Sequence, residues 1–184
     1  MRCFIAINLY KDIKKEVERV QKMVEPYFQG KLVTPENLHI TLKFLDDIDD
    51  ITVTKVKERL SSIKFQSFRL LLKKVTVFKR KSIKMIWLEV DEIPLQKVVD
   101  DNLKDLFQRN SKFIGHITIA RVKKFNDETN FMKLLSNIEI KSLKIDVDEF
   151  CLKSSMLTKA GAIYKDLQKF CLLYTSPSPR DQRG

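Results

Sequence analysis

The two histidines of this 184-residue chain stand in the same short motif, a histidine followed two residues later by a threonine. His39 and Thr41 form the first copy, and His116 and Thr118 form the second. A neutral imidazole is a base and its conjugate acid is a proton donor near pH 7, so two histidines can divide the proton transfers of one displacement. A threonine hydroxyl beside each can donate a hydrogen bond to a phosphoryl oxygen. The paired motifs therefore indicate acid–base chemistry on a phosphate ester.

Each motif lies in a segment where polar and apolar residues alternate, which is typical of a half-buried β-strand. Side chains two residues apart on a strand share a face, so His39, Thr41 and Lys43 are expected to point to one surface. Lys43 is then a candidate for binding a substrate phosphate, with a solvated surface lysine as the alternative. Phe44, at an alternate position, is expected to face the core.

Apolar periodicity around the motifs predicts the elements that position them. Strands are expected at residues 2–9, 68–78, 85–90, 142–152 and 162–173, besides the two motif strands. Helices are expected at residues 12–27, from the acidic turn at 46–50 to about 63, and at 94–109 and 126–137, the last capped by Asn126.

The order strand, helix, motif strand, helix, strand occurs twice along the chain. Phe4 precedes His39 by 35 residues, and Met85 precedes His116 by 31. This repetition predicts an internal duplication and an α+β fold. We expect two lobes of antiparallel sheet with flanking helices, related by a pseudo-two-fold axis, with the motif strands across a shared cleft. Residues 1–173 would form this one bilobal domain.

The last residues, 174–184, have no apolar periodicity and contain two prolines and a glycine. They are expected to form a disordered tail, and their amino-acid sequence resembles that of translated vector DNA. No long apolar segment opens the chain, so neither a signal peptide nor a membrane span is expected, and a cytoplasmic location is predicted.

The chain carries a net charge of +11, from 35 Lys and Arg against 24 Asp and Glu. An excess of this size favours a polyanionic partner such as nucleic acid, with a solvated lysine-rich surface as the alternative. The three cysteines lie far apart, which argues against a disulfide framework and favours buried, inert thiols. With two histidines and no cysteine cluster, no structural zinc site is expected.

The motif pair resembles the two-histidine (2H) phosphoesterase superfamily, and most closely its RNA 2′,3′-cyclic phosphodiesterases, historically called 2′-5′ RNA ligases. The resemblance covers residues 1–173 and rests on residues 39–42, 116–121, 2–7, 35–38 and 155–164. It implies that both histidines are catalytic, that both threonines bind phosphate and that Arg121 contacts the phosphate. Strand alternation alone would turn Arg121 away from His116, so this role requires the strand to end or bulge there. The sequence departs from the family at Asp46, where a glycine is common.

The activity implied by the resemblance is metal-independent hydrolysis of a terminal 2′,3′-cyclic phosphate on RNA to a 2′-phosphate, with 2′-5′ RNA ligation as a further activity. The implied partner is an RNA with such an end, for example a tRNA fragment, acted on by a monomer without a cofactor. The alternatives are a non-catalytic RNA- or nucleotide-binding module and a phosphodiesterase for a small cyclic nucleotide. Phe44 and Trp87 are able to stack on a base, although core packing is the favoured interpretation of both. Tyr164 is a weaker candidate for lining the cleft.

Overall fold

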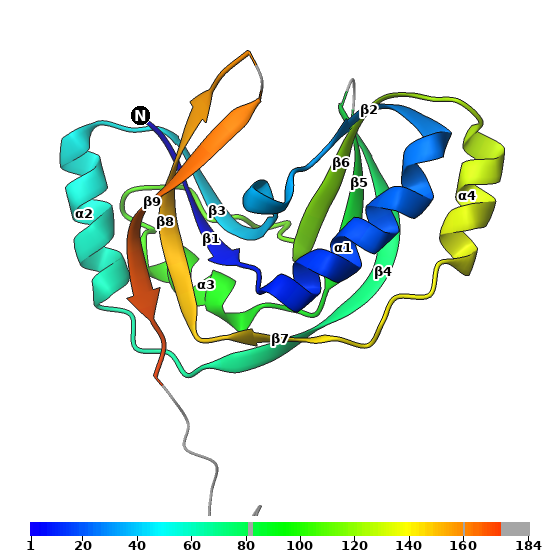
Figure 1. Cartoon of the computed structure of the whole chain (residues 1–184). Coiled ribbons are helices and arrows are strands. Elements are labelled where there is room, and N and C mark those ends of the chain that lie inside the picture. Colours follow the sequence, from blue (N-terminus) through cyan, green and yellow to red (C-terminus); the bar gives the residue numbers. More distant parts are fainter. Residues whose placement is uncertain (81–82, 160, 174–184) are drawn as a thin grey trace, which may run out of the picture.

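The computed structural model describes residues 1–80, 83–159 and 161–173, which form an α+β fold of two lobes on either side of an open V (Figure 1). The helices are α1 (Lys11–Val24), α2 (Asp50–Ser61), α3 (Pro94–Asn102) and α4 (Glu128–Asn137), with 3-10 turns η1 (Glu25–Tyr27) and η2 (Pro35–Asn37). The strands are β1 (Arg2–Asn8), β2 (Phe28–Leu32), β3 (His39–Asp47), β4 (Phe68–Arg80), β5 (Ile83–Val90), β6 (His116–Phe125), β7 (Lys144–Val147), β8 (Glu149–Leu157) and β9 (Ala162–Cys171).

The strands form one antiparallel sheet in the order β7-β4-β5-β6-β3-β1-β8-β9, with β2 paired to the free side of β6. The two motif strands, β3 and β6, pair only through Ile40 and Ile117, near the start of each strand. The sheet therefore splits beyond this point, and its halves diverge into the two arms of the V (Figure 1). Helices α2 and α3 flank the arm that contains β3, and α1 and α4 flank the arm that contains β6.

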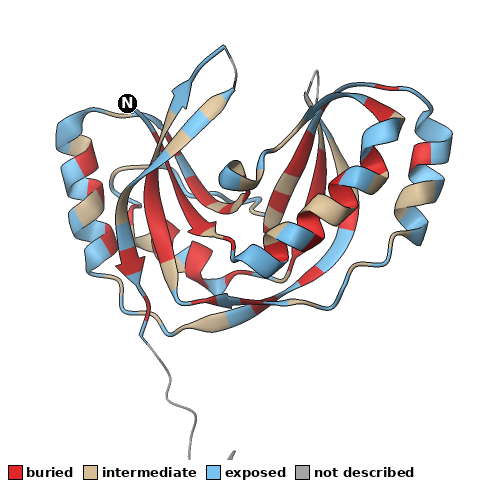
Figure 2. Ribbon diagram, in the orientation of Figure 1, coloured by how far each residue is buried: buried red, intermediate tan, exposed pale blue. Residues whose placement is uncertain are grey.

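Both motif strands carry the same sequence of half-buried, buried and exposed positions over their first nine residues. Their buried positions join one core that runs through both lobes, shown by the red faces in Figure 2. Ile40, Leu42 and Ile117 are at most 1% exposed in this core. The α+β class and the antiparallel sheet predicted from the repeated motif are confirmed, and the matched burial agrees with a duplicated unit.

Each motif strand bulges just after its threonine. The pairing of β3 with β1 passes from Thr41 to Lys43 and omits Leu42, and the pairing of β6 with β5 passes from Thr118 to Ala120. A bulge places one extra residue in one strand and reverses the alternation of side chains beyond it. Residues after each bulge therefore change face, a reversal that strict alternation along β3 did not predict.

A second irregularity in β3 accommodates Asp46, which has a φ of 56°. The register shifts again beside it, since Asp46 pairs with Cys3 and Phe44 pairs with Phe4. Left-handed backbone is natural for glycine, but aspartate is among the other residues that tolerate it. Asp46 thus adopts a conformation for which glycine is the usual residue.

Several predicted elements differ from the structure. The strand expected at residues 142–152 is two strands, since the chain leaves β7 on β4 and enters β8 on β1 in the other lobe. Helix α3 ends at Asn102, earlier than the predicted residue 109. Asp127, rather than Asn126, caps α4, because its carboxylate accepts a hydrogen bond from the amide of Asn130 at 3.0 Å. Cys171 is exposed, so the prediction of three buried thiols is correct only for the other two. The tail predicted at residues 174–184 lies outside the described residues.

Strand β2 was not predicted, because Gly30 interrupts the apolar pattern. The structure explains the glycine, since a Cβ atom there would lie 2.2 Å from the backbone oxygen of Arg121 on β6. Only a residue without a side chain allows β2 to approach β6 this closely.

We therefore expect Gly30→Ala to destabilise the fold by about 1–3 kcal/mol, the usual cost of overpacking. Urea unfolding of the variant measures this loss. The matched control is Gly161→Ala, whose Cβ would meet no atom within 4 Å, although its φ of 144° adds strain of its own. A Gly30→Ala protein as stable as the wild type would contradict the close approach of the two strands.

Candidate active site

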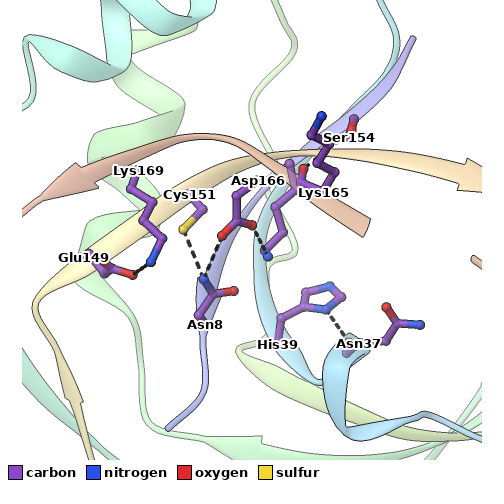
Figure 3. Close-up of polar contacts among 10 residues, drawn as sticks. Asn8, Asn37, His39, Glu149, Cys151, Ser154, Lys165, Asp166 and Lys169 are labelled. Carbon is purple, nitrogen blue, oxygen red and sulfur yellow. Dashed lines mark hydrogen bonds and ion pairs between the residues drawn. The ribbon is translucent and has the colours of Figure 1, made fainter. Parts of the chain in front are cut away.

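His39 stands at the first residue of β3, at the bottom of the V. Its Nδ1 lies 2.7 Å from the backbone oxygen of Asn37 (Figure 3). Its Nε2 lies 3.0 Å from Oγ1 of Thr41. A carbonyl oxygen can only accept a hydrogen bond, so Nδ1 carries the proton of the neutral ring. Nε2 then carries the lone pair of the ring and accepts a hydrogen bond from the Thr41 hydroxyl. It is the nitrogen that can take a proton from a substrate.

His116 repeats this arrangement at the first residue of β6. Its Nδ1 lies 2.7 Å from the backbone oxygen of Ile114, two residues earlier, as in the first motif. Its ring stacks on Trp87 with centroids 3.8 Å apart, and Trp87 stacks in turn on Phe78 at 4.4 Å. Both histidines thus have the same tautomer, and aromatic stacking holds the second ring in place.

The surroundings lower the pKa of both imidazoles. Burial lowers the pKa of His39 to about 4, with further lowering from the positive charges of Lys153, His116 and Arg121, against the raising effect of the Asn37 carbonyl. Burial also lowers the pKa of His116, opposed by the Ile114 carbonyl and by Glu89. Both rings are therefore neutral at pH 7 in the free protein, and a bound phosphate would raise both pKa values.

This depressed pKa predicts how stability depends on pH. Between about pH 6.5 and about pH 4 the unfolded chain binds a proton at residue 39 that the folded protein does not. Stability contributed by the neutral ring is thus complete above about pH 6.5 and is lost as the pH falls toward about 4. Urea unfolding across this range should show a weaker pH dependence in His39→Gln than in the wild type. Equal pH dependence in the two proteins would contradict the depressed pKa.

The bulge in β3 overturns the prediction for Lys43. This side chain is 4% exposed and turns away from the face of His39. Its ammonium donates to Asp100 at 2.5 Å and to the backbone oxygen of Gln108 at 2.6 Å. A buried, fully paired ammonium holds the fold together and is not free for a phosphate, so Lys43 is removed from the substrate-binding residues.

The two bulges bring Phe44 and Arg121 onto the histidine face instead. Each is the fifth residue after its histidine, and both are exposed. Phe44 is 69% exposed, so the prediction that it faces the core was wrong. The reason is the same bulge in β3 that turns Lys43 inward. The bulge that a cleft-facing Arg121 requires is present in β6. The positive charge of Arg121 contributes to the lowered pKa of His39.

A cavity of about 630 Å³ opens beside His116. Its walls are rich in aromatic side chains from both arms and include a loop that follows α3. The lining residues are Thr41, Leu42, Lys43, Phe44, Phe78, Trp87, Asn110, Lys112, Phe113, Ile114 and His116. The part that residues 110–114 play in the cavity wall was not predicted from the sequence. These residues follow helix α3, which ends earlier than its apolar pattern suggested. Trp87 is only 7% exposed and stacks on both His116 and Phe78, in agreement with the favoured interpretation of core packing.

Polar side chains gather on the other side of His39 (Figure 3). Asn8 donates to Sγ of Cys151 at 3.3 Å and to Asp166 at 3.4 Å, and Asp166 also accepts from the buried ammonium of Lys153. Tyr164 packs edge-on against the His39 ring, with centroids 5.2 Å apart, so it does border the histidine. Lys153 and Asp166 were missed because neither belongs to a motif.

No helix within the described residues is both long and apolar enough to cross a membrane. The same residues contain no group of three or more His, Cys, Asp or Glu that are placed to hold a metal ion.

Two histidines with the same tautomer stand at the first residues of matching strands in a two-lobed α+β fold, which is the arrangement expected of a two-histidine phosphoesterase. The LigT-like phosphoesterase family matches residues 7–87 and 93–164. The chain belongs to this family.

Curated relatives span nearly the whole chain. The RNA 2′,3′-cyclic phosphodiesterase of Archaeoglobus fulgidus is 35% identical over an alignment of 177 residues, which covers 92% of this chain and 99% of that protein. The enzyme of the same name from Thermotoga maritima is 36% identical over 176 residues, covering 91% of this chain and 93% of the relative.

Solved structures share the fold. A Thermus thermophilus structure has a TM-score of 0.78 at 21% identity, and covers 93% of this chain and 97% of its own. The structure of Escherichia coli LigT in complex with 3′-AMP has a TM-score of 0.74 at 23% identity, with the same coverage.

Proposed function

We propose that this protein hydrolyses a terminal 2′,3′-cyclic phosphate on RNA to a 2′-phosphate, with His39 and His116 as the acid–base pair. The observation that carries the proposal is the pair of equivalent imidazoles, each held at Nδ1 by a backbone carbonyl, so that Nε2 carries the lone pair that can take a proton. The names of the curated relatives, at 35% and 36% identity over most of the chain, support the same reaction.

The reaction needs one proton removed and one supplied. One neutral imidazole takes a proton from water as the water oxygen attacks phosphorus. The other, protonated, gives its proton to the 3′ oxygen as the bond from that oxygen to phosphorus breaks. The products are a 2′-phosphate and a 3′-hydroxyl, and the two imidazoles have exchanged roles. Because the pair supplies both proton transfers, we propose that hydrolysis requires neither a metal ion nor a cofactor.

The phosphate oxygens require donors and positive charge while negative charge builds up on them. Thr41 and Thr118 lie on the same strand faces as the histidines, and each is two residues from one. Arg121 stands beyond the bulge on the same face. We assign the two hydroxyls and the guanidinium to the nonbridging oxygens, where they stabilise the transition state. The Thr41 hydroxyl turns from His39 Nε2 to the phosphate when the substrate binds, because it has one proton to donate.

The aromatic cavity beside His116 suits the terminal nucleoside, since every nucleobase offers a flat face for stacking. Phe44 is the exposed ring at its border. Base stacking contributes about 1–3 kcal/mol per base, so Phe44→Ala is expected to raise the KM of a cyclic-phosphate substrate about tenfold or more. Phe44→Tyr, which keeps the ring, is the control. Steady-state kinetics that show equal KM values for wild type and Phe44→Ala would remove Phe44 from the substrate site.

The decisive experiment incubates the protein, in excess EDTA, with a short RNA that ends in a 2′,3′-cyclic phosphate. Chromatography against synthetic standards then identifies the product. We expect a 2′-phosphate end formed at the same rate with and without EDTA. A reaction that stops in EDTA and returns with a divalent cation would overturn the metal-independent mechanism. Tight RNA binding without turnover would instead indicate a binding module.

A further inference from the structure

The two arms of the cleft differ sharply in charge at matching positions. Beyond the motif, β6 carries Arg121, Lys123 and Lys124, whereas β3 carries Phe44, Asp46 and Asp47 at the same distances from its histidine. All six positions are exposed. At these positions β6 is therefore basic, whereas β3 carries two carboxylates, of which Asp47 lies 3.7 Å from the guanidinium of Arg2. An anionic polymer that leaves the histidine pair is attracted by β6 and repelled by β3.

Strand β2 adds a further positive charge to the basic arm. Lys31 pairs directly across from Arg121, so the two side chains share a face. Lys123 lies two residues beyond Arg121, at a further irregularity of β6 where the pairing with β2 passes from Val122 to Lys124, and its side chain is exposed. These three exposed side chains, Lys31, Arg121 and Lys123, form what we call the basic track.

The pairing of Lys31 with Arg121 destabilises the free protein, since like charges directly opposite on neighbouring strands destabilise a sheet. No ion pair within residues 1–80, 83–159 and 161–173 neutralises any of the three side chains. Lys79, by contrast, is paired with Glu128 near the same arm. The close approach at Gly30 nevertheless holds Lys31 beside Arg121. An arrangement with this cost is explained by an anion that spans both side chains.

We propose that the basic track binds the phosphodiester backbone upstream of the cyclic phosphate, so that the protein acts on RNA chains in preference to cyclic mononucleotides. This inference rests on the proposed function for the position of the cyclic phosphate at Arg121. Lys31 lies one strand spacing of about 5 Å away, and Lys123 two residues or about 7 Å along β6. Both are within reach of the next phosphates of a chain, and a cyclic mononucleotide has no such phosphates.

The test compares two substrates in wild type, Lys31→Gln, Lys123→Gln and the double variant. The first substrate is a short RNA with a 2′,3′-cyclic phosphate end, and the second is 2′,3′-cyclic AMP. The matched control is Lys144→Gln, an exposed lysine on β7, far from the mouth of the V (Figure 1). We expect each track variant to raise the KM for RNA and to leave kcat for RNA and kcat/KM for cyclic AMP unchanged.

Salt dependence gives a second readout, which separates lost phosphate contacts from a damaged fold. Each neutralised phosphate of a single strand contributes about 0.7 to the slope of log affinity against log salt concentration. The slope for the double variant, which loses two such contacts, should therefore be smaller by about 1.4. Equal losses of kcat/KM for RNA and for cyclic AMP, or an unchanged salt slope, would contradict the proposal that the basic track binds RNA.

Binding of a fluorescent RNA with a 2′-phosphate end, measured by anisotropy, separates this inference from the proposed function. Weaker binding by the track variants in a protein that hydrolyses nothing would sustain the track and refute the hydrolase. Normal hydrolysis with unchanged RNA binding by the variants would do the reverse.

Discussion

His39→Ala and His116→Ala are each expected to lower the turnover of cyclic-phosphate RNA by about 10²–10⁴-fold, the usual contribution of a general acid or base. Each imidazole is held by a backbone carbonyl and aromatic neighbours, and His39 also by the Thr41 hydroxyl, so its removal leaves no buried charge unpaired. Both variants should therefore remain folded. Steady-state kinetics at saturating substrate measures the loss, and circular dichroism checks the fold.

The double variant should lose less than the product of the two single losses, because the two histidines act as one unit. The pH profile of the wild type should be bell-shaped, and each single variant should lose one limb. A substrate with a better leaving group should rescue only the variant that lacks the acid, which assigns the two roles. Folded single variants with near wild-type turnover would refute the acid–base pair.

Asp100→Ala is expected to cost about 3–5 kcal/mol of stability, because it leaves the buried ammonium of Lys43 without a counter-ion. Both partners of this ion pair are at most 6% exposed. Asp100 also accepts a hydrogen bond from the backbone amide of Asn110 at 2.8 Å, at the edge of the aromatic cavity. The variant should thus loosen the loop that lines the cavity and raise KM as well. Urea unfolding and steady-state kinetics measure the two effects.

A neighbouring residue provides the control. Asp101 forms an exposed ion pair with Arg109 at 2.6 Å, so Asp101→Ala should cost about 1 kcal/mol or less. The double variant Lys43→Met with Asp100→Leu should recover much of the stability lost in Asp100→Ala, because it removes both charges together. If Asp100→Ala were no less stable than Asp101→Ala, the buried ion pair would not be important to the fold.

The histidine motifs and their strands were predictable because both depend on short-range order. A histidine and a threonine two residues apart share a strand face whatever surrounds them. The repeated order of elements indicated two matching lobes, and the family resemblance named the chemistry that the motif pair supports. The sequence also showed the departure at Asp46, although only the structure shows the left-handed backbone that this residue adopts.

Beyond the threonine of each motif, tertiary pairing decided which side chains reach the cleft. Strict alternation directed Lys43 outward and Phe44 inward, and the bulge at Leu42 exchanged them. The same geometry on β6 turned Arg121 toward the histidines. A bulge arises from the register between two strands that are far apart in the chain, and no residue of β3 alone specifies it.

The surroundings of the motifs likewise depended on contacts over long sequence distances. Lys43 meets Asp100, which is 57 residues away, and this pair anchors the loop that lines the aromatic cavity. Lys31 stands beside Arg121 only because Gly30 admits β2 to the edge of β6. Local sequence thus determined the proposed catalytic groups and the strands that carry them. The tertiary structure decided which charges and rings surround them, because register, burial and cross-strand partners are properties of the folded sheet.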